Sequence, residues 1–465
     1  MISRRSPQGR WVLTAAVLGS GMAMLDGTVV NVALPRIGEG LAASMADLQW
    51  VVNGYLLSLA SLILVGGSLG DHFGRRRMFM VGVAWFAAAS ACCAIAQTPL
   101  ELVLARLVQG IGAALLTPGS LAMIQGSFRQ EDRSQVIGQW AGLGGIAGAI
   151  GPLFGGWLIQ VTSWRWIFAL NVPIAVVVLV ICARHVPESR DPESARGFDV
   201  AGAALTAAGL AGVTLALVQP SASYAVGSAV AGVVALVAFL LVERRSAHPL
   251  VELSLFRSRV FSVANAMTLL VYGALGAMLF FLVLQLQVSV GYTPLEAGLA
   301  TVPITVLMLV GSGYSGALSQ RIGPRPQMSA GPVVCGVGVL LLRGVGPHTD
   351  YLIGVLPGLL LFSVGLVALV TPLTASVLAA APDRYAGAAS GVNNAVARTG
   401  SLLAVAALPA LVGLSGADYR HAAALTSAYR GAQLVCAVLL IAGGAVTFVG
   451  LSSRSPAPSP NNSSA

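Results

Sequence analysis

The feature that most constrains this chain is its division into long apolar segments separated by short polar ones. We place about fourteen such segments of roughly 18–25 residues, the length at which an α-helix crosses the hydrocarbon core of a bilayer. A backbone in lipid must satisfy its own hydrogen bonds, as a helix does. The expected fold class is therefore an all-α polytopic membrane protein. The segments cover residues 11–34, 48–69, 78–96, 101–124, 135–159, 167–183, 200–219, 225–242, 260–286, 295–318, 328–343, 351–379, 387–414 and 428–451.

The composition of the 465-residue chain fits no soluble class. It is 56% hydrophobic and only 9% charged, whereas soluble domains are about 25% charged. The net charge of +9 would suit a nucleic-acid partner, but the 26 basic residues are all arginines and nearly all lie in the gaps between apolar segments. That placement is typical of a topology signal, so we expect the lipid bilayer, and not nucleic acid, as a partner.

Cysteines and histidines give no sign of a metal centre. The five cysteines lie inside apolar segments, and the five histidines are scattered over separate polar ones. This pattern favours neither a disulfide framework nor a zinc site. We therefore expect no metal, no cofactor and no enzymatic activity.

The arginines also report the topology. With the N-terminus inside, the inward segments carry 19 arginines and the outward segments 5, while Arg106 and Arg398 lie within apolar segments, which together gives 26. Cytoplasmic loops of membrane proteins are enriched in arginine. We expect an even number of spans, both termini in the cytoplasm, and a place in the inner (cytoplasmic) membrane.

An internal repeat predicts how the spans are grouped. Residues 67–76 (GSLGDHFGRR) resemble residues 316–325 (GALSQRIGPR), and Asp47 matches Glu296 at the same offset of 249 residues. This offset corresponds to eight spans, so two six-helix halves with two inserted helices, a 6+2+6 arrangement, explain it best. Parallel halves of this kind are a known transporter plan.

The grouping gives four expected regions. A six-helix bundle covers residues 1–183, and residues 184–258 hold two inserted transmembrane helices with their flanking loops. A second six-helix bundle covers residues 259–451. The remaining residues, 452–465, are rich in Ser, Pro and Asn and are expected to form a disordered cytoplasmic tail.

The segment from 67 to 77 is a candidate gate at the cytoplasmic face. Its glycines allow tight turns, its aspartate can cap a helix or pair with an arginine, and its arginines suit the anionic leaflet. A pure topology signal would explain the arginines alone, but not the glycines or the degenerate second copy. The residues concerned are Gly67, Asp71, Gly74, Arg75, Arg76 and Arg77.

Asp26 and Arg106 are charged residues inside apolar segments. A charge at such a place must pair, face water or be neutralised. Asp26 is either a titrating site for a proton or cation, or a hydrogen-bonded structural carboxyl. The depths of Asp26 and Arg106 below the outer surface are similar, about 13 and 8 Å at 1.5 Å per residue, so we expect them to pair. Arg106 could alternatively bind backbone carbonyls.

Two further groups of residues are candidates for transport. Gly151, Pro152, Gly155 and Gly156 lie in a glycine-rich segment, which indicates either close helix packing or a bending element between the halves. Arg398 lies in the middle of an apolar segment, where it meets either a substrate or backbone carbonyls. The polar residues Asn31, Gln109, Asn393 and Asn394, together with Arg398, are the candidates for lining a substrate cavity.

These motifs together resemble the major facilitator superfamily, and within it the fourteen-helix drug:proton antiporters. Residues 25–35 (LDGTVVNVALP) are similar to that family's first-helix signature, and residues 67–77 to its loop motif. Residues 106–112 (RLVQGIG) are similar to its proton-coupling motif, and residues 151–156 (GPLFGG) to its exporter motif. The resemblance covers nearly the whole chain.

The resemblance implies a monomeric exporter of small hydrophobic or cationic compounds, such as drugs and antibiotics, driven by the proton gradient through alternating access. It assigns proton coupling to Asp26 and Arg106, and gating to Asp71 with the arginines that follow. Relatives that export dications carry a further carboxylate in the tenth helix, where this chain has only Glu296 at the outer end. We therefore expect neutral or monocationic substrates.

Two alternatives remain open from the sequence. One is an exporter of an endogenous metabolite or lipid. The other is a proton symporter that imports a sugar or organic acid, which would need a more polar cavity than these segments offer.

Overall fold

The computed structural model describes residues 2–190, 199–246, 249–382 and 385–451. The expected disordered tail, 452–465, lies outside these residues, as do Arg196, Arg384 and Arg454 of the arginine count. Within the described ranges the chain is helical and holds no β-strand. The helices are α1 (Pro7–Gly40), α2 (Met45–Phe73), α3 (Arg75–Ile95), α4 (Pro99–Ser127), α5 (Gln130–Val161), α6 (Trp166–Ala169), α7 (Asn171–His185), α8 (Val200–Val218), α9 (Ala225–Glu243), α10 (Arg259–Val288), α11 (Pro294–Ile322), α12 (Pro324–Leu342), α13 (Leu356–Ala379), α14 (Ala386–Leu411) and α15 (Ala422–Gly450), with short turns η1 (Leu253–Arg257), η2 (Tyr351–Val355) and η4 (Asp418–Arg420).

The described helices supply the expected number of membrane spans. Thirteen candidate spans are long and apolar enough to cross a bilayer, with α6 and α7 joined as one and η2 and α13 as another. α12 has 19 residues, and at 1.5 Å per residue it is about 28 Å long, which also suffices. The structure therefore confirms an all-α polytopic membrane protein with about fourteen spans.

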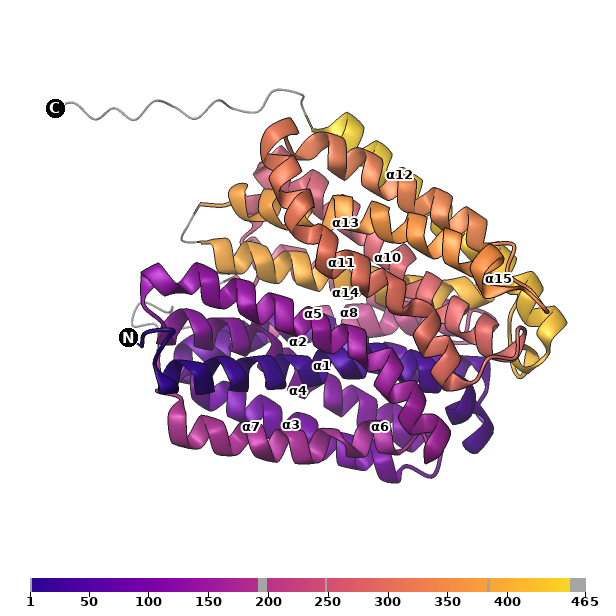
Figure 1. Cartoon of the computed structure of the whole chain (residues 1–465), viewed down its shortest axis with the longest axis horizontal. Helices are drawn as coiled ribbons and strands as arrows, with labels where there is room; N and C mark the ends of the chain where they lie inside the picture. The colour runs from indigo at the N-terminus through magenta and orange to yellow at the C-terminus, as the bar shows by residue number, and fades with distance from the viewer. Residues whose placement is uncertain (1, 191–198, 247–248, 383–384, 452–465) are drawn as a thin grey trace.

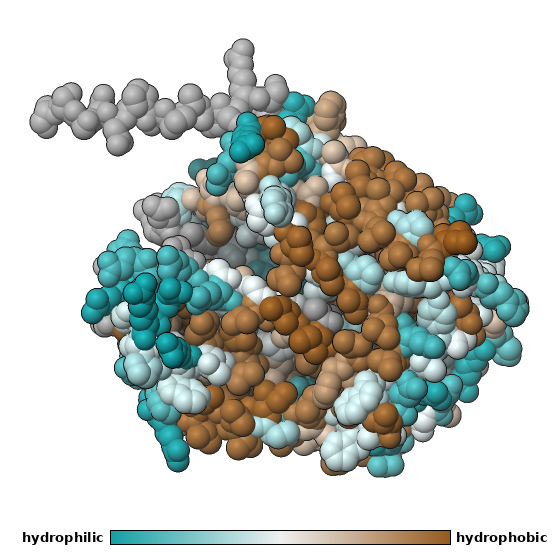
Figure 2. Space-filling view, in the orientation of Figure 1, coloured by the Kyte–Doolittle hydropathy of each residue, from teal (hydrophilic) through white to brown (hydrophobic). Residues whose placement is uncertain are grey.

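The surface has the polarity of a membrane protein. A hydrophobic band crosses the face shown in Figure 2, and hydrophilic residues gather at its left and right edges. These edges are the two ends of the helices, with the N-terminus at the left (Figure 1). We call the end where α1 begins the terminal end, and the other the opposite end.

The helices extend further than hydropathy predicts. α2 continues to Phe73 where we expected an end at 69, and α15 begins at Ala422 where we expected 428. Arg36 and Arg430, which we placed in outward loops, therefore lie within α1 and α15. Hydropathy marks only the part of a helix that needs lipid, whereas hydrogen bonding carries the helix on into the polar headgroup region.

The internal repeat gives matching helix starts. Ser44 caps α2 through a capping box with Asp47, and Thr293 caps α11 through a capping box with Glu296. Each hydroxyl and each carboxylate satisfies one main-chain amide that the first helical turn leaves free. The pairs are 249 residues apart, so the two halves begin their second helices in the same way.

The two halves also pack alike. In the first, α4 packs against α2 and α3, and α1 against α5 and α7. In the second, α13 packs against α11 and α12, and α10 against α14 and α15, which is the same arrangement. Figure 1 shows the first half from indigo to magenta in the lower part and the second half in orange and yellow in the upper part.

Several helix contacts join the halves and place the inserted helices. α5 packs on α11, and its counterpart α14 packs on α2, which keeps the two-fold relation. α8 lies against both α2 and α14, so it bridges the halves, and Figure 1 shows it in the middle of the view. α9 packs on α8 through small residues, among them Gly212 and Gly232, and only Ala225, Gly232 and Glu243 of α9 are buried.

Candidate functional site

Asp26 of α1 and Arg106 of α4 meet in the interior of the first half. Each residue is only 2% exposed. Nη1 of Arg106 donates a hydrogen bond to Oδ2 of Asp26 over 2.5 Å. Its Nε donates to the carbonyl of Val51 in α2 over 3.0 Å. From the sequence, an ion pair with Asp26 and a bond to a backbone carbonyl were alternatives for Arg106. Both occur together in the structure, and they link α1, α2 and α4.

Gln109 completes the pair. Its Nε2 donates to Oδ1 of Asp26 at 2.9 Å, and its Oε1 accepts from Arg106 at 2.6 Å. Its Nε2 also donates to Oγ of Ser90 at 2.7 Å, and Ser90 accepts from Nδ2 of Asn171 at 3.2 Å. We expected Gln109 to line a substrate cavity, but it is fully buried and orients the charge pair. Polar residues on α3 and α7 extend this network, and Ser90 was not among the residues that we singled out from the sequence.

Aromatic faces surround the guanidinium of Arg106. Its Cζ lies 4.4 Å from the ring centroid of Tyr55 and 5.7 Å from that of Phe168. Such cation–π contacts stabilise a desolvated cation. Arg106 therefore keeps a carbonyl, an amide oxygen and two rings as partners even when Asp26 is neutral. Asp26 without Arg106 would keep only the amide of Gln109. Removal of the carboxylate thus leaves more of the contacts at this site in place than removal of the guanidinium would.

The expected gate is not a loop. α2 continues through Gly67 and Asp71 to Phe73, and Arg75 already begins α3, so a single residue, Gly74, joins the two helices. Gly74 has a φ of 113°, which a side chain disfavours. Oδ1 of Asp71 accepts a hydrogen bond from Nε of Arg75 at 2.8 Å, one turn further along the chain.

Glu188 holds this junction and was missed by the sequence analysis. Its Oε1 accepts from the main-chain amide of Arg76 at 3.0 Å and its Oε2 from that of Arg77 at 3.2 Å. A carboxylate at a helix N-terminus satisfies free amides and complements the helix dipole. Glu188 follows α7, and no local pattern reveals that this segment returns to the start of α3.

The glycines of residues 151–156 lie at two helix contacts. A Cβ at Gly155 would come within 2.4 Å of Val29 in α1, and one at Gly156 within 2.4 Å of the Pro294 carbonyl in α11. A Cβ at Gly298 of α11 would in turn come within 2.2 Å of the Pro152 carbonyl. Gly151 faces α1 in the same way, where its Cβ would lie 2.5 Å from the Thr28 hydroxyl. This part of α5 therefore packs closely against α1 and against the other half.

The remaining cavity candidates form no hydrogen bond with the charge pair in the described part of the chain. Asn31 is partly exposed on α1. On α14, Nδ2 of Asn393 donates to Asn265 and Thr268 of α10 at 3.1 and 2.9 Å, so it joins helices of one half. Asn394 is exposed and bonds only to its own helix.

Arg398 follows Asn394 on α14. It is partly exposed, and among the described residues we find no hydrogen-bond or ion-pair partner for it. The sequence left open whether backbone carbonyls hold Arg398, and no such bond is present in the described part of the chain.

The two halves are fastened to each other at the opposite end. Side-chain hydrogen bonds across the interface gather there and tie the ends of α1 and α2 to the second half. The α5–α11 contact closes the same end. The bonds run from Gln49 to the carbonyls of Val405 and Ala406, from Gln287 to that of Val32, from Tyr419 to that of Ala43, and from Arg420 to those of Gly38 and Ala43.

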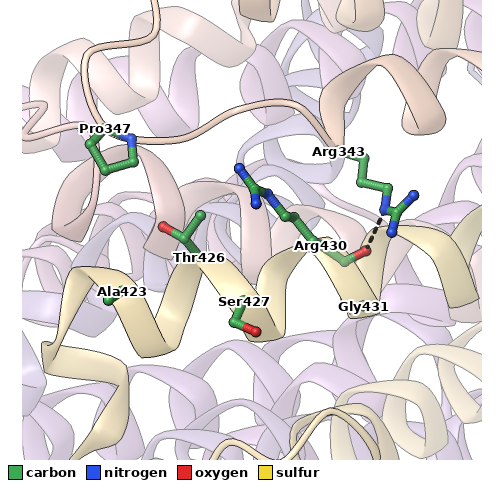
Figure 3. Close-up of a pocket in the computed structure, with 7 residues that line it drawn as sticks. All are labelled: Arg343, Pro347, Ala423, Thr426, Ser427, Arg430 and Gly431. Atoms are coloured by element: carbon green, nitrogen blue, oxygen red, sulfur yellow. Dashed lines mark hydrogen bonds between the residues drawn. The ribbon is translucent and has the colours of Figure 1, made fainter.

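A separate pocket of about 490 Å³ opens at the opposite end of the second half (Figure 3). It lies between α15 and the end of α12, where Nε of Arg343 donates to the carbonyl of Arg430 at 3.2 Å. It shares no residue with the Asp26–Arg106 pair. No group of three or more metal-binding side chains occurs among the described residues.

Comparisons with known proteins agree with this architecture. Residues 16–405 match the family model described as Major Facilitator Superfamily. The "Probable actinorhodin transporter" of Streptomyces coelicolor is 35% identical over 456 residues, which are 94% of this chain and 78% of that protein. The "Tetracenomycin C resistance and export protein" of Streptomyces glaucescens is 34% identical over 412 residues, which are 86% of this chain and 75% of that protein.

Solved structures show the same fold at low identity. A bacterial homologue of the human lysosomal transporter Spinster, in an inward-facing and unoccupied conformation, has a TM-score of 0.68 at 17% identity and covers 96% of this chain and 97% of its own. The xylose transporter XylE of E. coli, in an inward-open conformation, has a TM-score of 0.61 at 14% identity and covers 92% and 94%.

Proposed function

Because the chain belongs to the major facilitator superfamily, we propose that it exports small hydrophobic compounds of the drug and antibiotic class in exchange for protons. The names of its curated relatives support export: besides the two above, they include a "Puromycin resistance protein" from Streptomyces alboniger, 34% identical over 410 residues. The observation that carries proton coupling is the buried Asp26–Arg106 contact, because a membrane-embedded carboxyl with one switchable partner is suited to bind and release a proton.

The coupling works through the charge pair. When Asp26 is ionised, its bond to Arg106 holds α1 against α4. A proton on Asp26 removes the negative charge and weakens that bond. The guanidinium of Arg106 keeps its hydrogen bonds to Val51 and Gln109 and its contacts with the two aromatic rings. α1 also packs on α5, which meets α11 of the other half. A shift of α1 is thereby passed to the interface that opens and closes, which is alternating access by rocking of the halves.

The topology follows from the arginines and the helix order. We place the terminal end in the cytoplasm and the opposite end outside, with the protein in the cytoplasmic membrane. The junction around Gly74, with Asp71, Arg75 and Glu188, then faces the cytoplasm and acts as a gate. Transport needs no cofactor and no enzymatic step, and we assign it to the monomer, with bundles 1–183 and 259–451 as the moving bodies.

Transport in proteoliposomes tests the proposal. The purified chain is reconstituted with a pH gradient, and uptake of radiolabelled puromycin and tetracenomycin C is followed. Asp26→Asn should abolish gradient-driven uptake. Glu39→Gln is a matched control, because Glu39 is also on α1 and pairs with an arginine, Arg36, but is exposed to solvent. A pump-deficient host that expresses each variant gives the corresponding resistance profile.

Two results would contradict the proposal. Full gradient-driven uptake by Asp26→Asn would remove the proton-coupling role from Asp26. Absence of any resistance or uptake by the wild-type chain, over a panel that also includes cationic dyes, would remove drug export.

A further inference from the structure

An unpartnered cation lies in the middle of the second half. Arg398 is the thirteenth residue of the 26-residue helix α14, and it has no hydrogen-bond or ion-pair partner among the described residues. An arginine at such a depth is costly unless it meets an anion, water or backbone carbonyls. The neighbouring Asn393 shows the contrast, because its amide is fully engaged with α10.

The packing of α14 places Arg398 near the contact between the two halves, because α14 packs on α2 of the first half as well as on α10 of the second. It contributes to the electrostatic environment of the hydroxyl of Tyr55, on α2 of the first half, and of Tyr272, on α10 of the second. Tyr55 also stacks on Arg106, so Arg398 lies near the charge pair but outside it. Its side chain is partly exposed, and Asn394, one turn closer to the terminal end on the same face, is exposed. Arg398 therefore lies on the same face of α14 as the exposed Asn394, with part of its own side chain exposed.

The charge balance of the interior leaves Arg398 uncompensated. Asp26 is the only carboxyl in the middle of a span in the described part of the chain, and it is bound to Arg106 and Gln109. The one acid within the described helices α10 to α15 is Glu296, which is used in the capping box at the start of α11. The pair cancels itself, so Arg398 gives the centre a net positive charge.

We propose that Arg398 binds an anionic group of transported compounds, and that the substrates include hydrophobic compounds with an acid group, such as an aromatic carboxylate. The planar guanidinium donates two parallel hydrogen bonds to a carboxylate, and a site shielded from water strengthens them. This inference rests on the proposed function and specifies a substrate class for it. It departs from the neutral or monocationic substrates that we expected from the sequence. Arg398 is a substrate-binding residue in this view and takes no part in carrying the proton.

Binding to paired probes tests this inference without any gradient. The probes are naphthalene-2-carboxylate, anthracene-9-carboxylate and pyrene-1-carboxylate, each with its methyl ester, which has nearly the same shape without the charge. Affinity is measured by probe fluorescence with the full-length protein in nanodiscs. Wild type should bind the acids more tightly than the esters by about tenfold, or 1.4 kcal/mol.

The variants separate the charge from the fold. Arg398→Gln should bring the ratio of acid to ester affinity close to one while ester affinity is unchanged, which also shows that the variant is folded. Arg398→Lys should keep most of the preference. Arg343→Gln removes an exposed arginine at the end of α12 and should leave the ratio as in wild type. Partition of the probes into lipid cancels when ratios are compared between variants.

Two outcomes would overturn the inference: a wild type that binds no acid more tightly than its ester, or an Arg398→Gln variant that keeps the preference. Neither depends on protons. If wild type prefers the acids but Asp26→Asn still transports with the gradient, the coupling proposal fails and the substrate class stands. If wild type shows no preference for the acids but Asp26→Asn abolishes gradient-driven transport, the substrate class fails and the coupling proposal stands.

Discussion

Replacing Arg106 by glutamine removes the cation from a contact that is almost fully buried. Asp26 is 2% exposed and would keep only the amide of Gln109, at 2.9 Å from Oδ1. Breaking a buried pair in this way costs about 3–5 kcal/mol, because an uncompensated charge is left in the interior. Arg106→Gln should therefore be strongly destabilising.

The reverse replacement should cost less. In Asp26→Asn the guanidinium keeps the carbonyl of Val51, the amide oxygen of Gln109 and two aromatic faces. Loss of one hydrogen bond to a charged group is worth about 1.5–3 kcal/mol. The double variant Asp26→Asn with Arg106→Gln holds two neutral amides that can bond to each other. Its loss should be smaller than the sum of the two single losses by about 2–3 kcal/mol.

Thermal unfolding of the purified variants in one detergent measures this order. The apparent midpoint should be highest for wild type and lowest for Arg106→Gln, with the double variant above Arg106→Gln. Since membrane proteins commonly unfold irreversibly, all variants are compared at one heating rate. If the double variant loses as much as both single variants together, the two side chains do not stabilise each other and the reasoning is wrong.

Three further changes test the junction and the interface. Glu188→Gln weakens the cap on α3 and should lower stability by about 0.5–2 kcal/mol, measured by thermal unfolding, with Glu131→Gln on an exposed site as the control that should change little. Gly298→Val places a side chain against the Pro152 carbonyl and should hold α5 and α11 apart, seen as a longer distance between spin labels at the opposite end; an unchanged distance would contradict the close contact. Gln49→Leu removes two hydrogen bonds to α14 and should also lengthen the distance between the spin labels at the opposite end, but by less than Gly298→Val does. An increase as large as that of Gly298→Val would contradict this expectation.

The architecture could be predicted because the features that determine it are local in the sequence. Spans need long apolar runs, and the repeat shows at Asp47 and Glu296, which cap equivalent helices in the structure. The pairing of Asp26 and Arg106 could also be predicted, because pairing lowers the cost of burying two opposite charges at similar depth in the membrane.

Other features depend on contacts that no local pattern encodes. Gln109 lies three residues after Arg106 on the same face of α4, so it turns to the charge pair and not to a cavity. Glu188 acts through a main-chain contact more than a hundred residues away in sequence. The single-residue junction at Gly74 was taken for a loop because hydropathy falls four residues before the helix ends.

Proton movement driven by the drug itself examines the coupling role of Asp26 without an imposed gradient. Proteoliposomes that enclose a pH-sensitive dye receive puromycin or tetracenomycin C outside, at equal pH on both sides. As the drug enters, wild type and Glu39→Gln should drive protons out and make the interior alkaline, while Asp26→Asn should show no change in interior pH. Drug-driven proton efflux by Asp26→Asn at the wild-type rate would show that the proton travels by another residue.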